Sequence, residues 1–275
     1  MTVPFAARLD TAVASRGRLC VGIDPHPASL AAWGLENDLD GLEHFSRGLV
    51  DAVGAHVACL KPQSAFFEAH GPEGLGVLAR VLGDIASTGA LSILDVKRGD
   101  IGSTMVAYAR AYLADDAPLA ADAITVSPFL GFGTLTPALD LAEKTGRGLF
   151  VLTRTSNPEG AGVQLAHRPS REVGAVRTVA QDIVVAAAAA NAAAGSALVG
   201  LVIGATLKTL DVDLVGFDGW VLAPGIGTQG GEVAHLRELF GASLHRVLPT
   251  ASRAVADAGP NCSKVAARLA QSAIF

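Results

Sequence analysis

The chain has 275 residues, of which half are hydrophobic and 17% are charged, so intrinsic disorder is excluded. Lys and Arg total 21 against 26 Asp and Glu, which gives a net charge of −5. Because the chain is acidic overall, we expect no nucleic-acid partner.

Short apolar runs rich in β-branched residues recur along the chain, and a segment with helical spacing of apolar residues follows each one. The eight predicted strands are residues 19–24, 57–61, 91–97, 123–127, 149–153, 198–203, 220–223 and 246–250. Strands that alternate with helices pair in parallel, and eight such units in a chain of this length are typical of a (β/α)8 TIM barrel. We therefore predict an α/β fold in which residues 1–275 form a single barrel domain.

A doubly wound open sheet is the alternative fold. It would carry a Gly-x-Gly-x-x-Gly pattern after the first strand, and residues 24–34 do not contain one. The barrel also explains the apolar composition, since parallel strands that are covered on both faces are nearly continuous apolar runs. The stretch 156–171, which is rich in glycine and proline, is predicted to be a long loop after the fifth strand.

One stretch, residues 183–207, lacks charged residues and is long enough to cross a bilayer of about 30 Å. Much of it is alanine, which is only weakly apolar, and Asn191 interrupts it. We therefore predict a helix that ends near Gly195 and a strand at 198–203, with no contact between the protein and a membrane.

The compartment is predicted from the N-terminus and the cysteines. Residues 1–17 lack the apolar core of about 7 to 15 residues that a signal peptide requires. The three cysteines, Cys20, Cys59 and Cys262, are odd in number and widely spaced, which favours buried free thiols. Both features predict a cytoplasmic protein.

Charged residues gather at the ends of the predicted strands, where a barrel places its active site. The first strand ends in Asp24, the second in Lys61, and the third carries Asp95 and Lys97 with Asp100 just beyond. Asp95 and Lys97 are two residues apart, so on an extended strand both side chains face the barrel interior. Charges at the end of an apolar barrel are costly unless they are paired. The alternating charges therefore indicate either a catalytic site or an ion-pair lock that closes the barrel.

A second chemical signal follows the last two strands. The glycine-rich segment 225–231 follows the seventh strand, and Arg253 follows the eighth. Backbone N–H groups of a glycine loop and a bidentate arginine are common phosphate ligands at this end of a barrel. The pair Pro224-Gly225 alone is compatible with a simple turn, but its combination with Arg253 favours a phosphate-binding site.

The segment 95–100 has the pattern Asp-x-Lys-x-x-Asp, and with it the chain resembles the orotidine 5′-phosphate decarboxylase family. Further similar segments follow the order of the longer bacterial branch of that family and, together with Arg253, span residues 21–253. They are residues 21–25, 60–68, 94–104, 155–158 and 224–231.

The resemblance implies a reaction that needs neither cofactor nor metal, in which orotidine 5′-monophosphate loses CO2 and becomes UMP, the last step of de novo pyrimidine biosynthesis. Lys97 is expected to be the acid that protonates C6 of the pyrimidine, and Asp95 to lie against the substrate carboxylate. Lys61 is expected to hold this network and to contact the ribose, and Asp100 completes the catalytic set.

The resemblance also implies which residues bind the substrate. Asp24 is expected to bind the ribose hydroxyls and Ser156 the base, while Gln229 and Arg253 would hold the phosphate.

Family members are dimers with active sites at the subunit interface. The resemblance therefore implies a homodimer in which Asp100, Ile101 and Thr104 reach into the partner's site.

Two other functions remain open at this point. Sugar-phosphate decarboxylases and aldolases of the same barrel superfamily share the Asp-x-Lys-x-x-Asp pattern, but they hold Mg²⁺ with an acidic residue at the end of the second strand. Here that residue is Lys61, whose ammonium group repels a cation. A non-catalytic barrel that binds a nucleotide is the other alternative, and it would not require Lys97 beside Asp95.

Overall fold

The computed structural model describes residues 2–169, 176–227, 233–259 and 262–272. Eight parallel strands close into a barrel in the order β1, β10, β9, β8, β5, β4, β3 and β2. These strands are β1 (Cys20–Ile23), β2 (Cys59–Pro62), β3 (Leu91–Arg98), β4 (Ala123–Val126), β5 (Gly148–Arg154), β8 (Val199–Ile203), β9 (Val221–Pro224) and β10 (Val247–Ala251). Each of the eight predicted strands overlaps one of them, so the prediction of a (β/α)8 barrel is confirmed.

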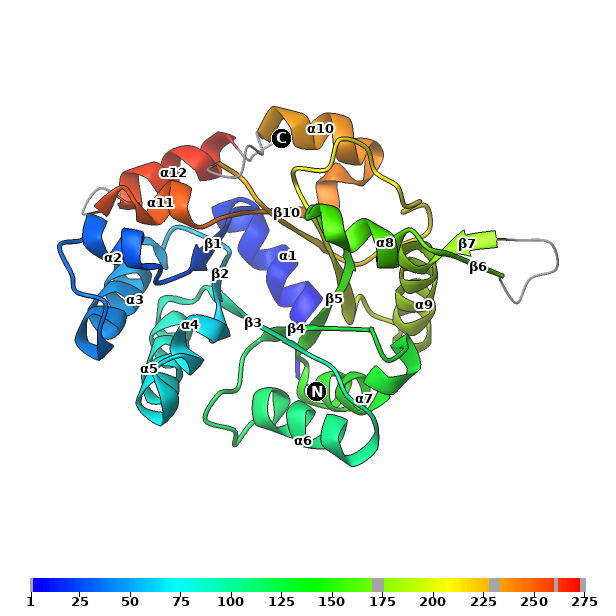
Figure 1. The fold of residues 1–275 in the computed structure, drawn as a ribbon, viewed down its shortest axis with the longest axis horizontal. Coiled ribbons are helices and arrows are strands. Elements are labelled where there is room, and N and C mark those ends of the chain that lie inside the picture. Colours follow the sequence, from blue (N-terminus) through cyan, green and yellow to red (C-terminus); the bar gives the residue numbers. More distant parts are fainter. Residues whose placement is uncertain (1, 170–175, 228–232, 260–261, 273–275) are drawn as a thin grey trace.

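Helices surround the barrel, and the longer ones other than the first lie along its outside, while the first crosses the middle of the view (Figure 1). They are α1 (Phe5–Arg16), α2 (Pro27–Ala32), α3 (Leu39–Val53), α4 (Ser64–Glu68), α5 (Gly71–Thr88), α6 (Gly102–Leu113), α7 (Thr136–Thr145), α8 (Ala161–Gln164), α9 (Val179–Ala194), α10 (Val233–Phe240), α11 (Arg253–Ala256) and α12 (Cys262–Ser272). Because helices cover their outer faces, the barrel strands are almost completely buried, which agrees with their continuous apolar sequences.

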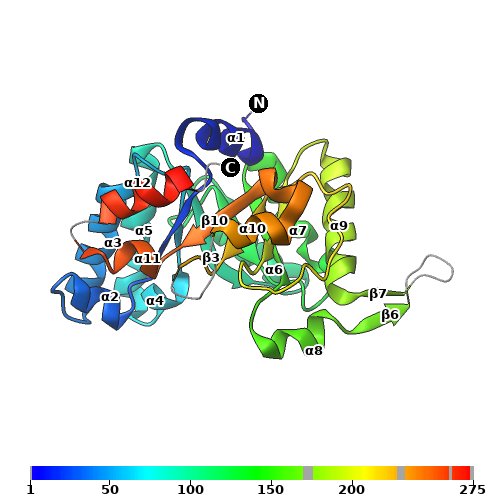
Figure 2. The ribbon, with the colours of Figure 1, turned by 90° about the horizontal axis from the view of Figure 1, so that it is seen from above.

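Helix α1 closes one end of the barrel. Its buried residues Phe5 and Leu9 belong to the same apolar cluster as the first residues of the strands, such as Cys20 and Leu91. The Phe5 ring packs edge-on against Phe150 with centroids 6.0 Å apart. Gly148 leaves room for Phe5, since a Cβ there would lie 2.5 Å from the ring. Figure 2 shows α1 at one edge of the molecule and α2, α4 and α8, which follow β1, β2 and β5, at the other, so α1 covers the amino-terminal end of the barrel.

The prediction of a long loop over 156–171 is wrong in part. This stretch contains the short helix α8 and the strand β6 (His167–Pro169), which pairs antiparallel with β7 (Val176–Thr178). The two strands project from the barrel in Figure 2. A strand of three residues has too short a pattern to be detected from sequence, because its pairing partner decides whether it forms.

The alanine-rich stretch forms α9, which ends at Ala194 and leads into β8, as predicted. Among the described residues, no helix has the length and apolar character needed to span a membrane. The three cysteines are buried and carry free thiols, which confirms that prediction.

Candidate active site

A cavity of about 280 Å³ opens at the carboxyl end of the barrel. Residues in or directly after all eight barrel strands line it. Six of the predicted site residues are among them: Asp24, Lys61, Asp95, Lys97, Ser156 and Arg253. The barrel thus brings together side chains that are as much as 229 positions apart in the sequence, from residue 24 to residue 253.

An irregularity in β3 shapes the floor of the cavity. Leu94 pairs with Ile124 and Arg98 with Val126, so residues 95–97 of β3 face one residue of β4, Thr125. Lys97 has φ of 47° and is the only non-glycine residue in the described chain with a positive φ. This conformation costs about 1–2 kcal/mol in a residue with a Cβ. Both Asp95 and Lys97 line the cavity, but a bulge places them there instead of the regular alternation of an extended strand.

Two ammonium groups hold one carboxylate. Lys61 Nζ lies 2.8 Å from Asp95 Oδ2, and Lys97 Nζ lies 2.6 Å from Asp95 Oδ1. The side chains of Lys61 and Asp95 are only 5% and 8% exposed, whereas that of Lys97 is 46% exposed. Lys97 therefore presents its ammonium group to the cavity while it stays fixed by a buried partner.

These ion pairs decide the charge state of the buried groups. Burial alone would raise the pKa of Asp95, but the ammonium groups of Lys61 and Lys97 outweigh it and hold that pKa well below its ordinary value. Burial alone would lower the pKa of Lys61, but the carboxylates of Asp95 and Asp24 outweigh it and raise that pKa. Both groups are therefore ionised throughout the neutral range.

The lowered pKa predicts how stability depends on pH. Because the pKa of Asp95 is lower in the folded than in the unfolded chain, its contribution is complete above about pH 5 and is lost as the pH falls below about 4. Urea unfolding should show that Asp95→Asn lowers the free energy of unfolding by about 3 kcal/mol at pH 7. That difference should shrink by about 1.4 kcal/mol per pH unit below pH 4. A difference that is constant from pH 7 to pH 3 would contradict the assignment.

Two buried oxygen atoms in the cavity have no hydrogen-bond partner within the described chain. They are Oδ1 of Asp24, after β1, and Oγ1 of Thr250, on β10. A buried polar atom without a partner is costly, so these atoms point to a ligand that supplies hydroxyl or other polar groups. Asp24 was predicted to bind such a ligand, whereas Thr250 was not.

Gly225 and Ile226, at the start of the glycine-rich segment, and Arg253 lie on the opposite side of the cavity from β3, after β9 and β10. Gly225 and Gly227 have φ of 115° and 87°, which favours glycine at both positions. Gln229, which was predicted to bind phosphate, lies outside the described residues.

The residues predicted to serve the partner's site are not among those that line the cavity. Asp100, Ile101 and Thr104 do not line it, and the Asp100 carboxylate accepts a hydrogen bond from Ile101 N at 2.7 Å. Among the described residues of one chain, ion pairs therefore join Lys61, Asp95 and Lys97, and Asp100 is not part of this network.

Five polar residues of the cavity were not among the predicted site residues: Gln63, Thr125, Thr155, Thr250 and Ser252. Gln63 donates to the Asp95 backbone carbonyl at 3.4 Å, and Thr125 donates to Asp95 Oδ1 at 2.8 Å. Thr125 and Thr250 lie inside apolar strands, where threonine is a common residue, so the sequence holds no signal that marks them.

A search of the described residues for groups of three or more His, Cys, Asp or Glu side chains that could hold a metal ion identifies none. At the end of β2, where a carboxylate ligand would be needed, Lys61 donates to Asp95 instead.

Comparison with known proteins gives consistent results. Residues 17–268 match the model of the Orotidine 5′-phosphate decarboxylase / HUMPS family. The chain is 52% identical to the orotidine 5′-phosphate decarboxylase of Salinispora arenicola, over 96% of this chain and 93% of that protein. It is also 52% identical to the enzyme of that name from Streptomyces coelicolor, with 94% and 91% covered. A solved structure from Streptomyces avermitilis that bears the same enzyme name is 50% identical, with a TM-score of 0.93 and 98% and 95% of the two chains covered.

Proposed function

The chain belongs to the orotidine 5′-phosphate decarboxylase family, and we propose that the residues at the carboxyl end of its barrel carry out this reaction with Lys97 as the proton donor. The enzyme is a carboxy-lyase that converts orotidine 5′-monophosphate to UMP and CO2 in pyrimidine biosynthesis. The observation that supports the assignment of roles is the Lys97 ammonium group, which is held 2.6 Å from a buried carboxylate and opens onto the cavity.

Repulsion by the Asp95 carboxylate raises the free energy of the bound substrate and so favours the loss of CO2. A second carboxylate about 4 Å from it would be repelled by about 4 kcal/mol at an effective dielectric constant of about 20. Because Asp95 stays ionised, this repulsion is present when the substrate binds and disappears from the pyrimidine when CO2 leaves.

Lys97 completes the reaction. The electron pair of the broken carbon–carbon bond remains on C6, where the ammonium group stabilises it before donating a proton to form the C6–H bond. The neutral amine then regains a proton from water, which reaches Lys97 because its side chain is 46% exposed. Lysine suits this role better than arginine, which does not give up its proton.

The rest of the cavity anchors the substrate. The unpartnered Asp24 Oδ1 accepts a hydrogen bond from a ribose hydroxyl, with Lys61 beside it. Ser156, which lines the cavity, contacts the base, and Arg253 and Gln229 bind the phosphate. Binding energy from the phosphate, which is remote from the reacting carbon, then supports the chemical step.

Arg253 should therefore matter more for binding than for chemistry. Arg253→Ala should raise KM about 10- to 100-fold because a charge-assisted bond to phosphate is worth about 1.5–3 kcal/mol. The value of kcat at saturating substrate should fall much less. Steady-state kinetics followed by ultraviolet absorbance measure both constants. Arg80→Ala, on the outer helix α5, is the control and should leave KM unchanged.

The dimer is part of the proposal. Ile101 is 59% exposed and Phe129 79%, and the exposed apolar residues Val106 and Leu130 belong to the same two segments of the chain. These segments follow β3 and β4, beside the cavity residues of those strands. A partner chain that covers this surface would bury the apolar side chains. Asp100, Ile101 and Thr104 of one chain would then lie at the cavity of the partner chain.

The test of the reaction itself is direct. Mixing the purified protein with orotidine 5′-monophosphate should remove the ultraviolet absorbance of the orotate ring as UMP forms. Absence of any change with the wild-type protein would contradict the proposed function.

A further inference from the structure

Thr125 lies at the centre of the catalytic network without a role in the proposed mechanism. It is on β4, only 1% exposed, and lines the cavity. It is also the residue that faces the bulged segment 95–97 of β3.

The hydroxyl group of Thr125 joins two catalytic residues. It donates to Asp95 Oδ1 at 2.8 Å and accepts a hydrogen bond from the backbone N–H of Lys97 at 2.9 Å. A hydroxyl has one hydrogen to donate, and here Asp95 receives it. Thr125 therefore has no hydrogen left for the substrate, and any effect on the reaction must pass through Asp95 and Lys97.

Asp95 and Lys97 both need their hydrogen bonds with Thr125 to hold their positions. Asp95 Oδ1 also accepts from Lys97 Nζ at 2.6 Å, so the Thr125 hydroxyl fixes the orientation of the carboxylate that holds the catalytic ammonium group. Lys97 has its positive φ at the point where the regular pairing of β3 with β4 is interrupted. The bond to Thr125 holds the backbone N–H in that strained conformation.

We propose that Thr125 is a positioning residue that places the Lys97 ammonium group and the Asp95 carboxylate for proton transfer to C6. This inference rests on the proposed roles of Lys97 and Asp95. Without the hydroxyl group, the carboxylate loses one of its fixed donors and the Lys97 backbone can relax. A displacement of about 1 Å at a reacting group is enough to reduce a rate by up to about 100-fold.

Thr125→Val tests the proposal, because valine keeps the shape of threonine and removes only the hydroxyl group. We expect kcat to fall about 10- to 100-fold while KM changes less than about threefold. Thr125→Ser keeps the hydroxyl group and should retain kcat within about threefold of the wild-type value. If the valine variant does not fold, Thr125→Ala is compared with Thr125→Ser by the same criteria.

Thr153→Val is the matched control. Thr153 is a fully buried threonine on the next strand, β5, and its hydroxyl group donates to the Val151 carbonyl at 2.9 Å without reaching the cavity. Its variant should lower the melting temperature and leave kcat unchanged.

Three results would overturn the role of Thr125. They are a kcat of Thr125→Val within about threefold of wild type, a loss in Thr125→Ser as large as in Thr125→Val, and an equal loss of kcat in Thr153→Val. A wild-type protein without activity on orotidine 5′-monophosphate would instead contradict the proposed function, so the two failures are distinguishable.

Discussion

Lys97→Ala is expected to lower kcat for the decarboxylation of orotidine 5′-monophosphate by at least about 10⁴-fold. In the proposed mechanism, the variant removes both the cation that stabilises the carbanion at C6 and the proton that completes the product. Single-turnover measurements with excess enzyme determine the residual rate. Substrate binding should persist, because Asp24, Lys61 and Arg253 remain in the cavity.

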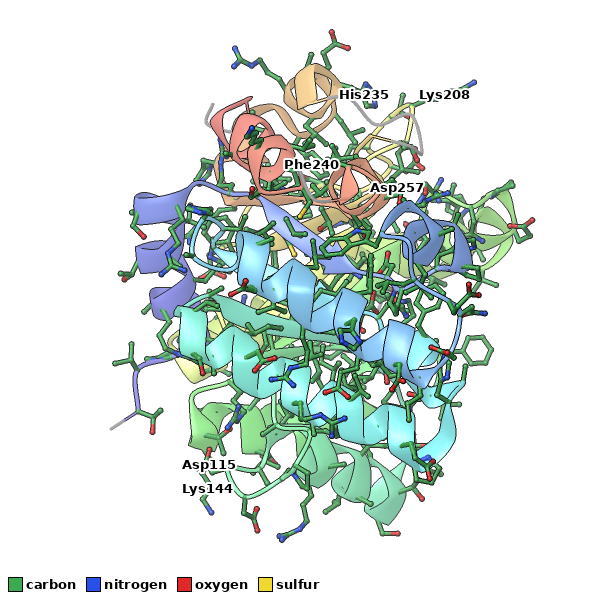
Figure 3. All side chains as sticks on the ribbon, turned by 90° about the vertical axis from the view of Figure 1, so that its left-hand side faces the viewer. Asp115, Lys144, Lys208, His235, Phe240 and Asp257 are labelled. Atoms are coloured by element: carbon green, nitrogen blue, oxygen red, sulfur yellow. The ribbon has the colours of Figure 1, made fainter. Side chains whose placement is uncertain are left out.

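Two further variants separate the possible causes of this loss. Lys97→Arg keeps the positive charge but supplies no transferable proton, so it should remain nearly inactive. Lys144→Ala is the control, since Lys144 is exposed at the end of α7 on the outside of the molecule (Figure 3). A Lys97→Ala variant that retains more than about a tenth of the wild-type kcat would contradict the assignment of Lys97 as the acid.

Mixing two inactive variants, Lys97→Ala and Asp100→Ala, is expected to restore activity. If Asp100 serves the partner's site, a mixed dimer has one site that lacks both residues and one that is intact. Random exchange makes about half of the dimers mixed, so about a quarter of all sites should be active. The recovered activity is measured after the two variants are unfolded and refolded together.

The matched control uses two residues of the same cavity. Lys97 and Asp24 line one cavity within a single chain, so a mixture of Lys97→Ala and Asp24→Ala should stay inactive. Recovery in this control, or none in the mixture with Asp100→Ala, would contradict a site that is shared between subunits.

The sequence predicts much of this enzyme because its barrel is built from local patterns. Each βα unit has its own apolar strand and amphipathic helix, and the alternation alone indicates parallel pairing. The charged residues that end the strands, such as Lys61 and Asp95, are visible for the same reason: they interrupt apolar runs.

Features that depend on contacts between distant segments were not predicted. The strands β6 and β7 have only three residues each, and each forms because the other pairs with it. Thr125 is an ordinary strand residue in the sequence, and it acquires its position only because β4 pairs with β3.

By itself the sequence determined the barrel, the family and most of the charged residues around the cavity, since each depends on residue types at short spacings. Only the tertiary structure decided how Asp95 and Lys97 are held. Their spacing predicted a regular strand, but a bulge with a positive φ at Lys97 places both at the cavity. The hydrogen bonds that hold this bulge come from a strand about 30 residues away, and such long-range pairing is not written in any local pattern.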